Sequence, residues 1–286
     1  MDGDAGLYGP GSEAWRTNRE ATLLLGAGPR ALLLQIAHPL VAEGVDQHSG
    51  FREDPWSRLA RTTRSYLRIV YGTRTEAQAE IRRLNTMHRT IQGPTRDLTA
   101  RRRHGVRYTA RDPELLLWVH ATLVDSTIVV YDRWLGPLTR DRRERYYEET
   151  RPIGRAFGVP EDRLPRDLDA FEAYLASMLA LDGPVHPTST ARELAHHILH
   201  PSLGPLAPPS VRRIVAAIPT SLYDWTLWPA VGLLPTRVRE EFGLPWGAAE
   251  RLTAAWLTRT WLAWRRVLPS SFRQFRQARD AERRAG

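Results

Sequence analysis

Nine histidines are the strongest neutral metal ligands in this chain of 286 residues, because it contains no cysteine. The same absence excludes disulfides, iron–sulfur clusters, thiolate haem ligands and cysteine nucleophiles. One histidine on a buried helix, facing open space, is the minimum protein ligand for a haem iron. The expected burial pattern makes His38, His88 and His120 the candidates. The commoner role for each is that of a hydrogen-bonded core residue.

A second group of chemically capable residues is Arg58, Arg61 and Thr62, which are spaced i, i+3 and i+4 and share one helix face. Arginine pairs readily with carboxylates, so this face suits the acidic edge of a cofactor. The same pattern also fits a solvated basic face, since further arginines follow on that helix. Asn85 stands one turn before His88 and could donate a hydrogen bond at a cofactor rim or simply be exposed.

Two other spacings resemble metal sites. Glu193 and His196 match half of a di-iron motif, which needs a second Glu-x-x-His and two more glutamates on facing helices. The sequence contains no second Glu-x-x-His, which argues against a di-iron centre. His196 and His200 lie one helical turn apart and could form a two-ligand patch, although such pairs are more often surface coincidences.

The charged residues exclude several function classes. All 41 residues counted as lysine or arginine are arginine, so no Schiff-base or P-loop lysine exists. The net charge of +9 is compatible with nucleic acid or an acidic membrane surface, but the arginines are scattered and the densest cluster is only Arg101 to Arg103. The sequence also lacks GxGxxG, Walker A, GxSxG and HExxH motifs, which removes support for nucleotide-binding and hydrolase functions.

Proline, glycine and capping residues divide the chain into about ten expected helices. The clearest ones span 54–72 after Asp54-Pro55, 75–93 after a Thr75-x-x-Gln78 capping box, 112–136 after Asp112-Pro113, 139–158, 167–183, 190–201 after Thr190-x-x-Glu193, and 246–268. Only the run from Gly105 to Ala110 is expected to be extended. We therefore predict one all-α domain over residues 16–270, with a flexible arm at 1–15 and a polar, arginine-rich tail at 271–286.

The segment from 112 to 135 is apolar on nearly every face, which predicts a helix buried among others. His120 lies within it and needs a hydrogen-bond partner or a ligand there. Together with Asp125, it interrupts the longest apolar stretch, so we expect no membrane span. The first residues lack the features of a signal peptide, which favours a cytoplasmic protein.

A resemblance extends over most of the chain. The segments that carry it are Gly28 to Pro39 (GPRALLLQIAHP), His48 to Phe51, Asp54-Pro55, Arg58 to Thr62, Gly72, His88, Gly93, Tyr108 to Leu115, Trp118 to His120, Leu234-Pro235 and Gly243 to Trp246. In this order and density they resemble the MpaB-type oxygenase family, which also contains the rubber oxygenases called latex clearing proteins.

This resemblance implies a mostly helical, globin-like core that holds one b-type haem. His88 matches the proximal iron ligand, and Arg58 and Thr62 match the family's Arg and Thr. Arg61 replaces a lysine that sits near the open iron face in the rubber oxygenases. An arginine stays protonated and is a poor ligand, so lysine-type distal ligation is excluded here.

The resemblance also implies an activity. We expect a haem-dependent oxygenase that binds O₂ opposite His88 and oxidises a hydrophobic, isoprenoid or lipid-like substrate, for example by cleaving a C=C bond. Glu43, which could remove a proton from an allylic carbon, and Arg61 are the expected catalytic residues. His38 is expected to line the cofactor cavity or to cap the last carbonyls of its helix, and His120 is expected to lie around the cofactor site or in the core.

A second reading comes from another class of protein. The chain could be a non-enzymatic all-α haem or lipid carrier, or a basic DNA-binding regulator. A carrier would bind its ligand without consuming O₂, and a regulator would show no haem spectrum. The absence of a recognisable helix-turn-helix with an exposed recognition helix argues against the regulator.

Overall fold

The computed structural model describes residues 4–49, 55–203, 206, 208–219 and 224–286. Within them the chain is all-α apart from one small sheet, as predicted. The first helices are α1 (Glu13–Asn18), α2 (Ala21–Ala37), α3 (Pro39–His48), α4 (Pro55–Tyr71), α5 (Arg74–Thr90), α6 (Leu98–His104), α7 (Pro113–Trp134) and α8 (Arg140–Ala156). The remaining helices are α9 (Leu168–Met178), α10 (Ser189–Leu199), α11 (Arg212–Ala216), η3 (Asp224–Leu227), α12 (Trp228–Val231), α13 (Thr236–Glu241), α14 (Ala248–Val267), α15 (Ser270–Arg273) and α16 (Arg276–Ala285).

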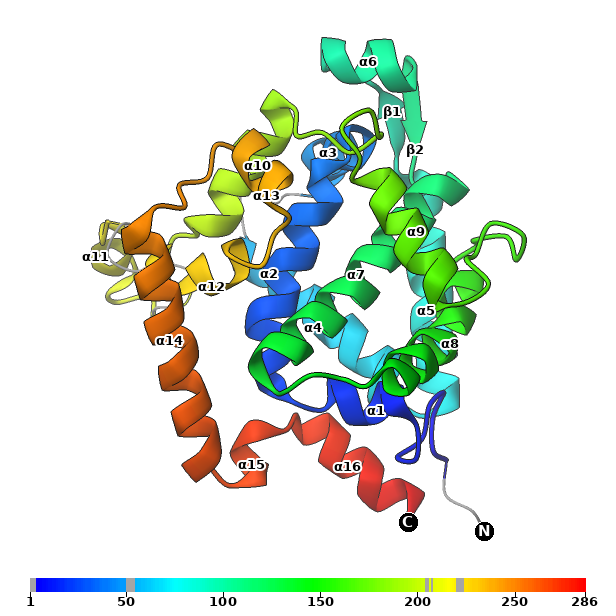
Figure 1. The fold of residues 1–286 in the computed structure, drawn as a ribbon, viewed down its shortest axis with the longest axis vertical. Helices are drawn as coiled ribbons and strands as arrows, with labels where there is room; N and C mark the ends of the chain where they lie inside the picture. Colours follow the sequence, from blue (N-terminus) through cyan, green and yellow to red (C-terminus); the bar gives the residue numbers. More distant parts are fainter. Residues whose placement is uncertain (1–3, 50–54, 204–205, 207, 220–223) are drawn as a thin grey trace.

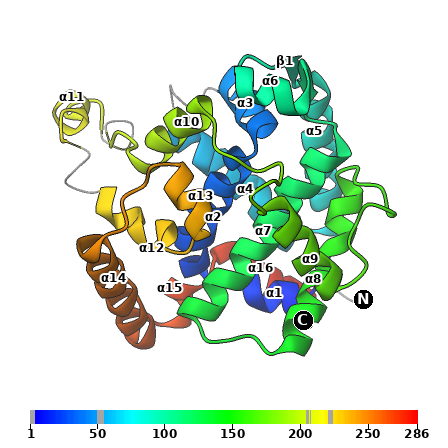
Figure 2. The ribbon, with the colours of Figure 1, turned by 45° about the horizontal axis from the view of Figure 1, so that its top comes forward.

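Helices α2 and α7 form the centre of the molecule and lie side by side in both ribbon views (Figures 1 and 2). They approach closely because Gly26 leaves room for an indole: a Cβ added there would lie 2.4 Å from Cη2 of Trp134. A buried polar contact also joins them, since Arg30 Nη1 donates to Asp125 Oδ2 at 2.6 Å and to Ser126 Oγ at 2.8 Å. The prediction that α7 is a buried helix is confirmed, with Trp118 fully buried.

Helices α4 and α5 form an antiparallel hairpin at one side of α7. The buried Glu80 carboxylate of α5 accepts hydrogen bonds from Ser65 and Arg68 of α4, and from Arg83 one turn further along α5. The bonds from Arg83 are the main reason that the Glu80 pKa falls to about 2. This pairing fixes the register of the hairpin around Glu80.

The sheet is a two-stranded hairpin of β1 (Gln92–Pro94) and β2 (Arg107–Thr109), with Gly93 opposite Tyr108. It carries α6 away from the body, at the top of Figure 1. The extended run predicted near residues 105–110 is confirmed by β2. Strand β1 was not predicted, because its Gln-Gly-Pro sequence is typical of a helix end rather than of a strand.

Helix starts follow capping chemistry, and two of the expected caps are wrong. The capping box of α5 is Thr73 with Glu76, and the N-cap of α10 is Thr188. In each case the threonine two residues earlier makes the capping bond, and the expected threonine lies inside the helix. The caps Asp112, Thr139 and Asp167 are confirmed. The expected cap Asp54 lies outside the described residues.

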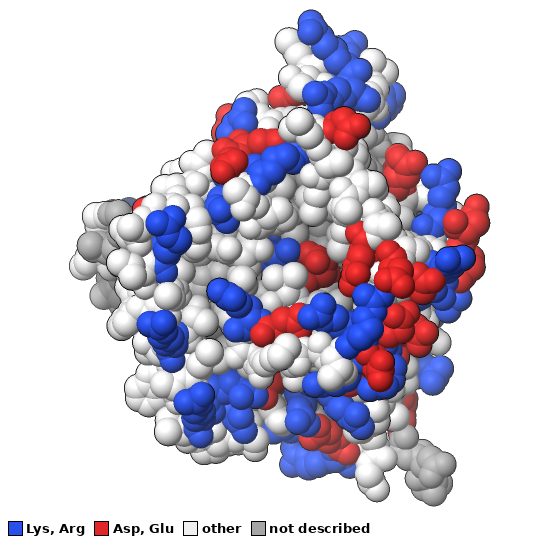
Figure 3. Space-filling model, in the orientation of Figure 1, with Lys and Arg blue, Asp and Glu red and all other residues white. Residues whose placement is uncertain are grey.

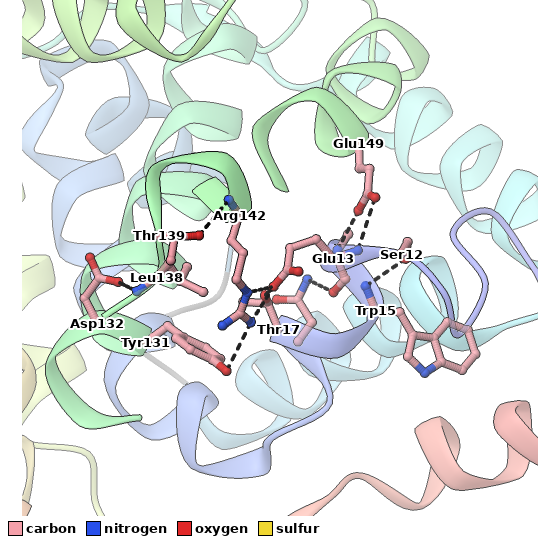
Figure 4. A network of polar contacts seen from close by, with 12 residues as sticks. Ser12, Glu13, Trp15, Thr17, Tyr131, Asp132, Leu138, Thr139, Arg142 and Glu149 are labelled. Atoms are coloured by element: carbon pink, nitrogen blue, oxygen red, sulfur yellow. Dashed lines mark hydrogen bonds and ion pairs between the residues drawn. The ribbon is translucent and has the colours of Figure 1, made fainter. Parts of the chain in front are cut away.

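The ends of the chain pack on the body. Figure 4 shows the contact of α1 with α8, where Glu149 accepts the backbone N–H groups of Glu13 and Ala14 at 3.1 and 2.6 Å. These bonds satisfy amides at the N-terminus of α1, where a negative charge is favourable. The tail expected after residue 270 contains α16, whose Ala278 and Ala281 are fully buried near α4.

By length and composition alone, α7 is apolar enough to cross a membrane, and the bent pair α2 and α3 would pass the same test as one span. Core helices meet the same criterion, and 67% of the apolar window in α7 is buried inside the fold.

Candidate functional site

His88 lies on the inner face of α5, in the stripe that also contains Ala77, Ile81 and Leu84. Its ring stands 6.3 Å from the ring of Phe157, between centroids. Its Nδ1 atom is buried and has no hydrogen-bond partner among the described residues. Burial lowers the pKa of His88, so the imidazole is neutral at pH 7. A neutral imidazole is the form that binds metals.

His120 projects from α7 toward Gly154 of α8. A Cβ added to Gly154 would lie 3.3 Å from Cδ2 of His120, so the glycine leaves the space that this ring occupies. The Nε2 atom is buried and, within the described part of the chain, has no hydrogen-bond partner. Burial lowers the pKa of His120 to about 4. A second neutral imidazole with an unused nitrogen therefore borders α8.

The C-terminal end of α8 brings α5 and α7 together. Asn85 Nδ2 donates to the carbonyl oxygen of Ala156 at 2.8 Å, and Phe157 contacts His88. Asn85 therefore holds two helices together through a bond that sequence analysis did not foresee. Gly154 and Phe157 were also missed, although a glycine inside a helix is a signal of close packing.

Arg58 is half-buried on α4, and its Nη1 lies 3.5 Å from the carbonyl oxygen of Ser49. Burial, and after it the charge of Arg61, lower the pKa of Arg58 to about 10. A lowered arginine pKa means that the surroundings disfavour its charge, which a nearby anion would reverse. Arg61 and Thr62 are exposed on the same helix, so only Arg58 of this predicted group is partly inside.

Glu43 is only 1% exposed and lies on α3. Its Oε1 accepts the N–H groups of Arg96 and Asp97 at 2.9 and 2.7 Å, and its Oε2 accepts Gln47 Nε2 at 2.6 Å. These bonds tie α3 to the segment before α6. The structure therefore gives Glu43 a positioning role in the fold, and none of these contacts connects it to His88.

His38 belongs to a different cluster. Its Nδ1 accepts the N–H of Leu40 at 3.3 Å and so caps α3. Its ring centroid lies 5.1 Å from that of His104, which in turn lies 5.3 Å from that of His186. Burial, followed by the charges of these two neighbours, lowers the pKa of His38 to about 3.

The cluster of histidines around His38 does not form a polydentate metal site. The same holds for the pair of His196, on α10, and His200, at its C-terminal cap. Among the described residues, no group of three or more histidine, aspartate or glutamate side chains is placed to hold an ion. The rings of His196 and His200 stack at 4.4 Å between centroids. A cavity of about 200 Å³ lies elsewhere, between α2, α12 and α14, and is lined by Leu25, Trp134 and Trp261.

The comparison with known families adds to this geometry. The sequence pattern described as "ER-bound oxygenase mpaB/B'/Rubber oxygenase, catalytic domain" matches residues 15–264. The chain belongs to this family. The match confirms the resemblance seen in the sequence and makes the protein an oxygenase-type catalytic domain. Helices α4, α5, α7 and α8, which carry the candidate residues, lie inside the mpaB/rubber oxygenase domain, whereas α15 and α16 lie beyond it.

Relatives of this mpaB/rubber oxygenase domain include two uncharacterized mycobacterial proteins. One is from Mycobacterium bovis and one from Mycobacterium tuberculosis, and each is 25% identical over 235 residues. The aligned part covers 79% of this chain and 82% of each relative. No solved structure matches the chain significantly.

Proposed function

We propose that the protein is a haem b-dependent oxygenase with His88 as its iron ligand. The observation that carries the proposal is the half-buried, neutral His88 imidazole, whose buried Nδ1 has no hydrogen-bond partner in the described residues of an oxygenase domain. Native cores rarely keep such an atom without a reason, and ligand binding is one. His120, the other imidazole at the end of α8, is a second residue that a cofactor would contact.

The residues present fit a haem. A single histidine suffices as protein ligand, so the lack of a polydentate group in the described residues is compatible with it. Arg58 supplies a partly buried cation on α4, the helix that pairs with α5, and a carboxylate of the cofactor would offset the cost of burying that charge. Arg61 and Thr62 would meet only the solvent side of the cofactor, because both are exposed.

The chain's own contribution to catalysis is positioning and exclusion of water. When bound, the haem would supply the activation of O₂. Asn85 and Phe157 hold the end of α5 against α8 and so fix the orientation of the His88 ring. The apolar inner faces of α5 and α7 keep the imidazoles neutral and favour a hydrophobic substrate. An isoprenoid or lipid-like chain oxidised at a C=C bond is the substrate class that we propose.

An absorption spectrum tests the cofactor. Protein purified as isolated, or reconstituted with hemin, is expected to show a Soret band that shifts on reduction with dithionite. His88→Ala is expected to abolish haem retention while helical circular dichroism stays intact. His197→Ala, on α10 and outside the site, is the matched control and is expected to retain haem. A colourless reconstituted protein, or a normal spectrum in His88→Ala, would refute the assignment.

A second measurement separates an oxygenase from a haem carrier. O₂ consumption is followed with an electrode after a polyisoprenoid such as squalene is added to the loaded protein. An oxygenase consumes O₂ in proportion to product, and the oxidised product is identified by mass spectrometry. A haem spectrum without any O₂ uptake would favour the carrier.

A further inference from the structure

Helix α14 turns an apolar face to the solvent. Leu252 and Val267 are each 71% exposed, Trp256 is 58% exposed, and Trp264 is 59% exposed. With 3.6 residues per turn, Leu252, Trp256 and Val267 fall on one face, and Trp264 lies at its edge. The opposite face carries Ala254 and Leu257, which are buried in the protein. Helix α14 therefore has two apolar faces: one packs against the rest of the protein, and the other is exposed to solvent.

Two cations lie along one side of this face. Arg259 and Arg266 are exposed, and neither has an acidic partner among the described residues. The only acid on α14 is Glu250, which accepts the N–H of Gly247 at the start of the helix. In Figure 3 the side of the molecule occupied by α14 shows mainly basic (blue) and uncharged (white) residues, whereas acidic (red) residues gather on the side of α8 and α9. The charge around the apolar face is therefore positive.

We infer that α14 docks the protein on the surface of an anionic lipid bilayer. Exposed tryptophan and aliphatic side chains bordered by arginines are the pattern of a helix that lies in the membrane interface. Tryptophan is favoured at the level of the headgroups, and each arginine near an anionic surface adds attraction. This inference is independent of the proposed haem site, because α14 carries none of its residues.

A second copy of the chain fits this face less well. In a symmetric dimer the same patch meets itself, so Arg259 and Arg266 would face their own copies. No acid on the outer face of α14 could neutralise them, and like charges across an interface are costly. An anionic bilayer would take up the exposed apolar side chains at its interface and would place negative headgroups beside the arginines.

Sedimentation with vesicles tests the inference on the full chain. We expect binding to vesicles of phosphatidylcholine with phosphatidylglycerol, much weaker binding to phosphatidylcholine alone, and loss of binding at high salt. The double variant Leu252→Ser and Trp256→Ser is expected to lower partitioning by about tenfold or more. Leu181→Ser, in the loop after α9 and 83% exposed, is the matched control and is expected to bind normally.

The charges are tested separately. Arg259→Gln with Arg266→Gln is expected to lower partitioning on anionic vesicles by about thirtyfold. Arg101→Gln with Arg102→Gln, on the protruding α6, removes the same charge from another basic part of the surface and is expected to have little effect. The inference is overturned if wild type fails to bind anionic vesicles, if the α6 pair alone abolishes binding, or if Trp256→Ser instead dissolves a dimer seen by light scattering.

Discussion

At the scale of single residues, the two imidazoles at the end of α8 are hard to explain by stability alone. A buried nitrogen without a partner costs about 1–3 kcal/mol, and a phenylalanine or leucine would fill similar space without that cost. His88 and His120 both carry such a nitrogen within the described residues. Both histidines stand out in the sequence, because an apolar helix face makes a polar residue conspicuous. The same pattern also singles out His38, whose ring caps a helix instead.

The charge of Arg58 gives a prediction at this scale. Arg58→Ala is expected to weaken hemin affinity about tenfold, because a hydrogen bond to a charged group contributes about 1.5–3 kcal/mol. The stability of the haem-free protein should fall little, since the low pKa indicates that burying this charge is unfavourable. A hemin titration measures the first effect and urea unfolding the second. Arg64→Ala, exposed on the same helix, is the control, and an unchanged titration in Arg58→Ala would remove this residue from the site.

At the scale of elements, local signals predicted most helices, but several boundaries depend on contacts. Asp112 with Pro113 and Thr139 identify helix starts by chemistry that acts within a few residues. Thr73 and Thr75 are both acceptable caps in the sequence, and the bonds between Thr73 and Glu76 decide between them. The pairing of β1 with β2 depends on residues that are distant along the chain, so β1 had no local signal.

The two glycines of α2 give a prediction about the central helix pair. Gly26→Ala is expected to lower the free energy of unfolding by about 1–3 kcal/mol, because the new Cβ would overlap the Trp134 ring at 2.4 Å. Gly28→Ala should stay within about 1 kcal/mol of wild type, since the nearest atom lies at 3.5 Å on the flexible Leu24 side chain. Urea unfolding of both variants measures the difference. Equal effects would show that α2 and α7 are not packed as described.

At the scale of the whole molecule, the sequence predicted the fold class and the family, whereas the assembly of the site depended on tertiary packing. Gly154, Phe157 and Asn85 join α5, α7 and α8, and no periodic pattern links these positions. Glu43 shows the opposite case. The family resemblance implied a catalytic role for Glu43, which stays a prediction; in the fold its Oε1 holds the segment before α6, and its Oε2 accepts a hydrogen bond from Gln47 of the same helix.

Buried histidines make the stability of the whole fold depend on pH. His38 and His120 have pKa values of about 3 and about 4, below the ordinary 6.5. Between pH 6.5 and 4 the unfolded chain therefore binds protons that the folded protein does not, so stability falls as the pH decreases. At pH 5 each group should cost about 1–2 kcal/mol relative to pH 7.5.

Urea unfolding at the two pH values measures this loss. His38→Asn keeps a side chain that can cap α3 but removes the titrating group. The loss between pH 7.5 and 5 should shrink in this variant by about 1–2 kcal/mol. An unchanged pH dependence in His38→Asn would exclude this imidazole as a source of the acid sensitivity.

The buried carboxylate of Glu43 on α3 should also protect two loop amides from hydrogen exchange. The amides of Arg96 and Asp97 lie between β1 and α6, outside any helix or strand, yet both donate to an acceptor that water does not reach. They should exchange with deuterated solvent as slowly as amides within the adjoining helices, unlike ordinary connecting segments. The projecting hairpin and its helix are thereby anchored through two protected protons and move together with α3.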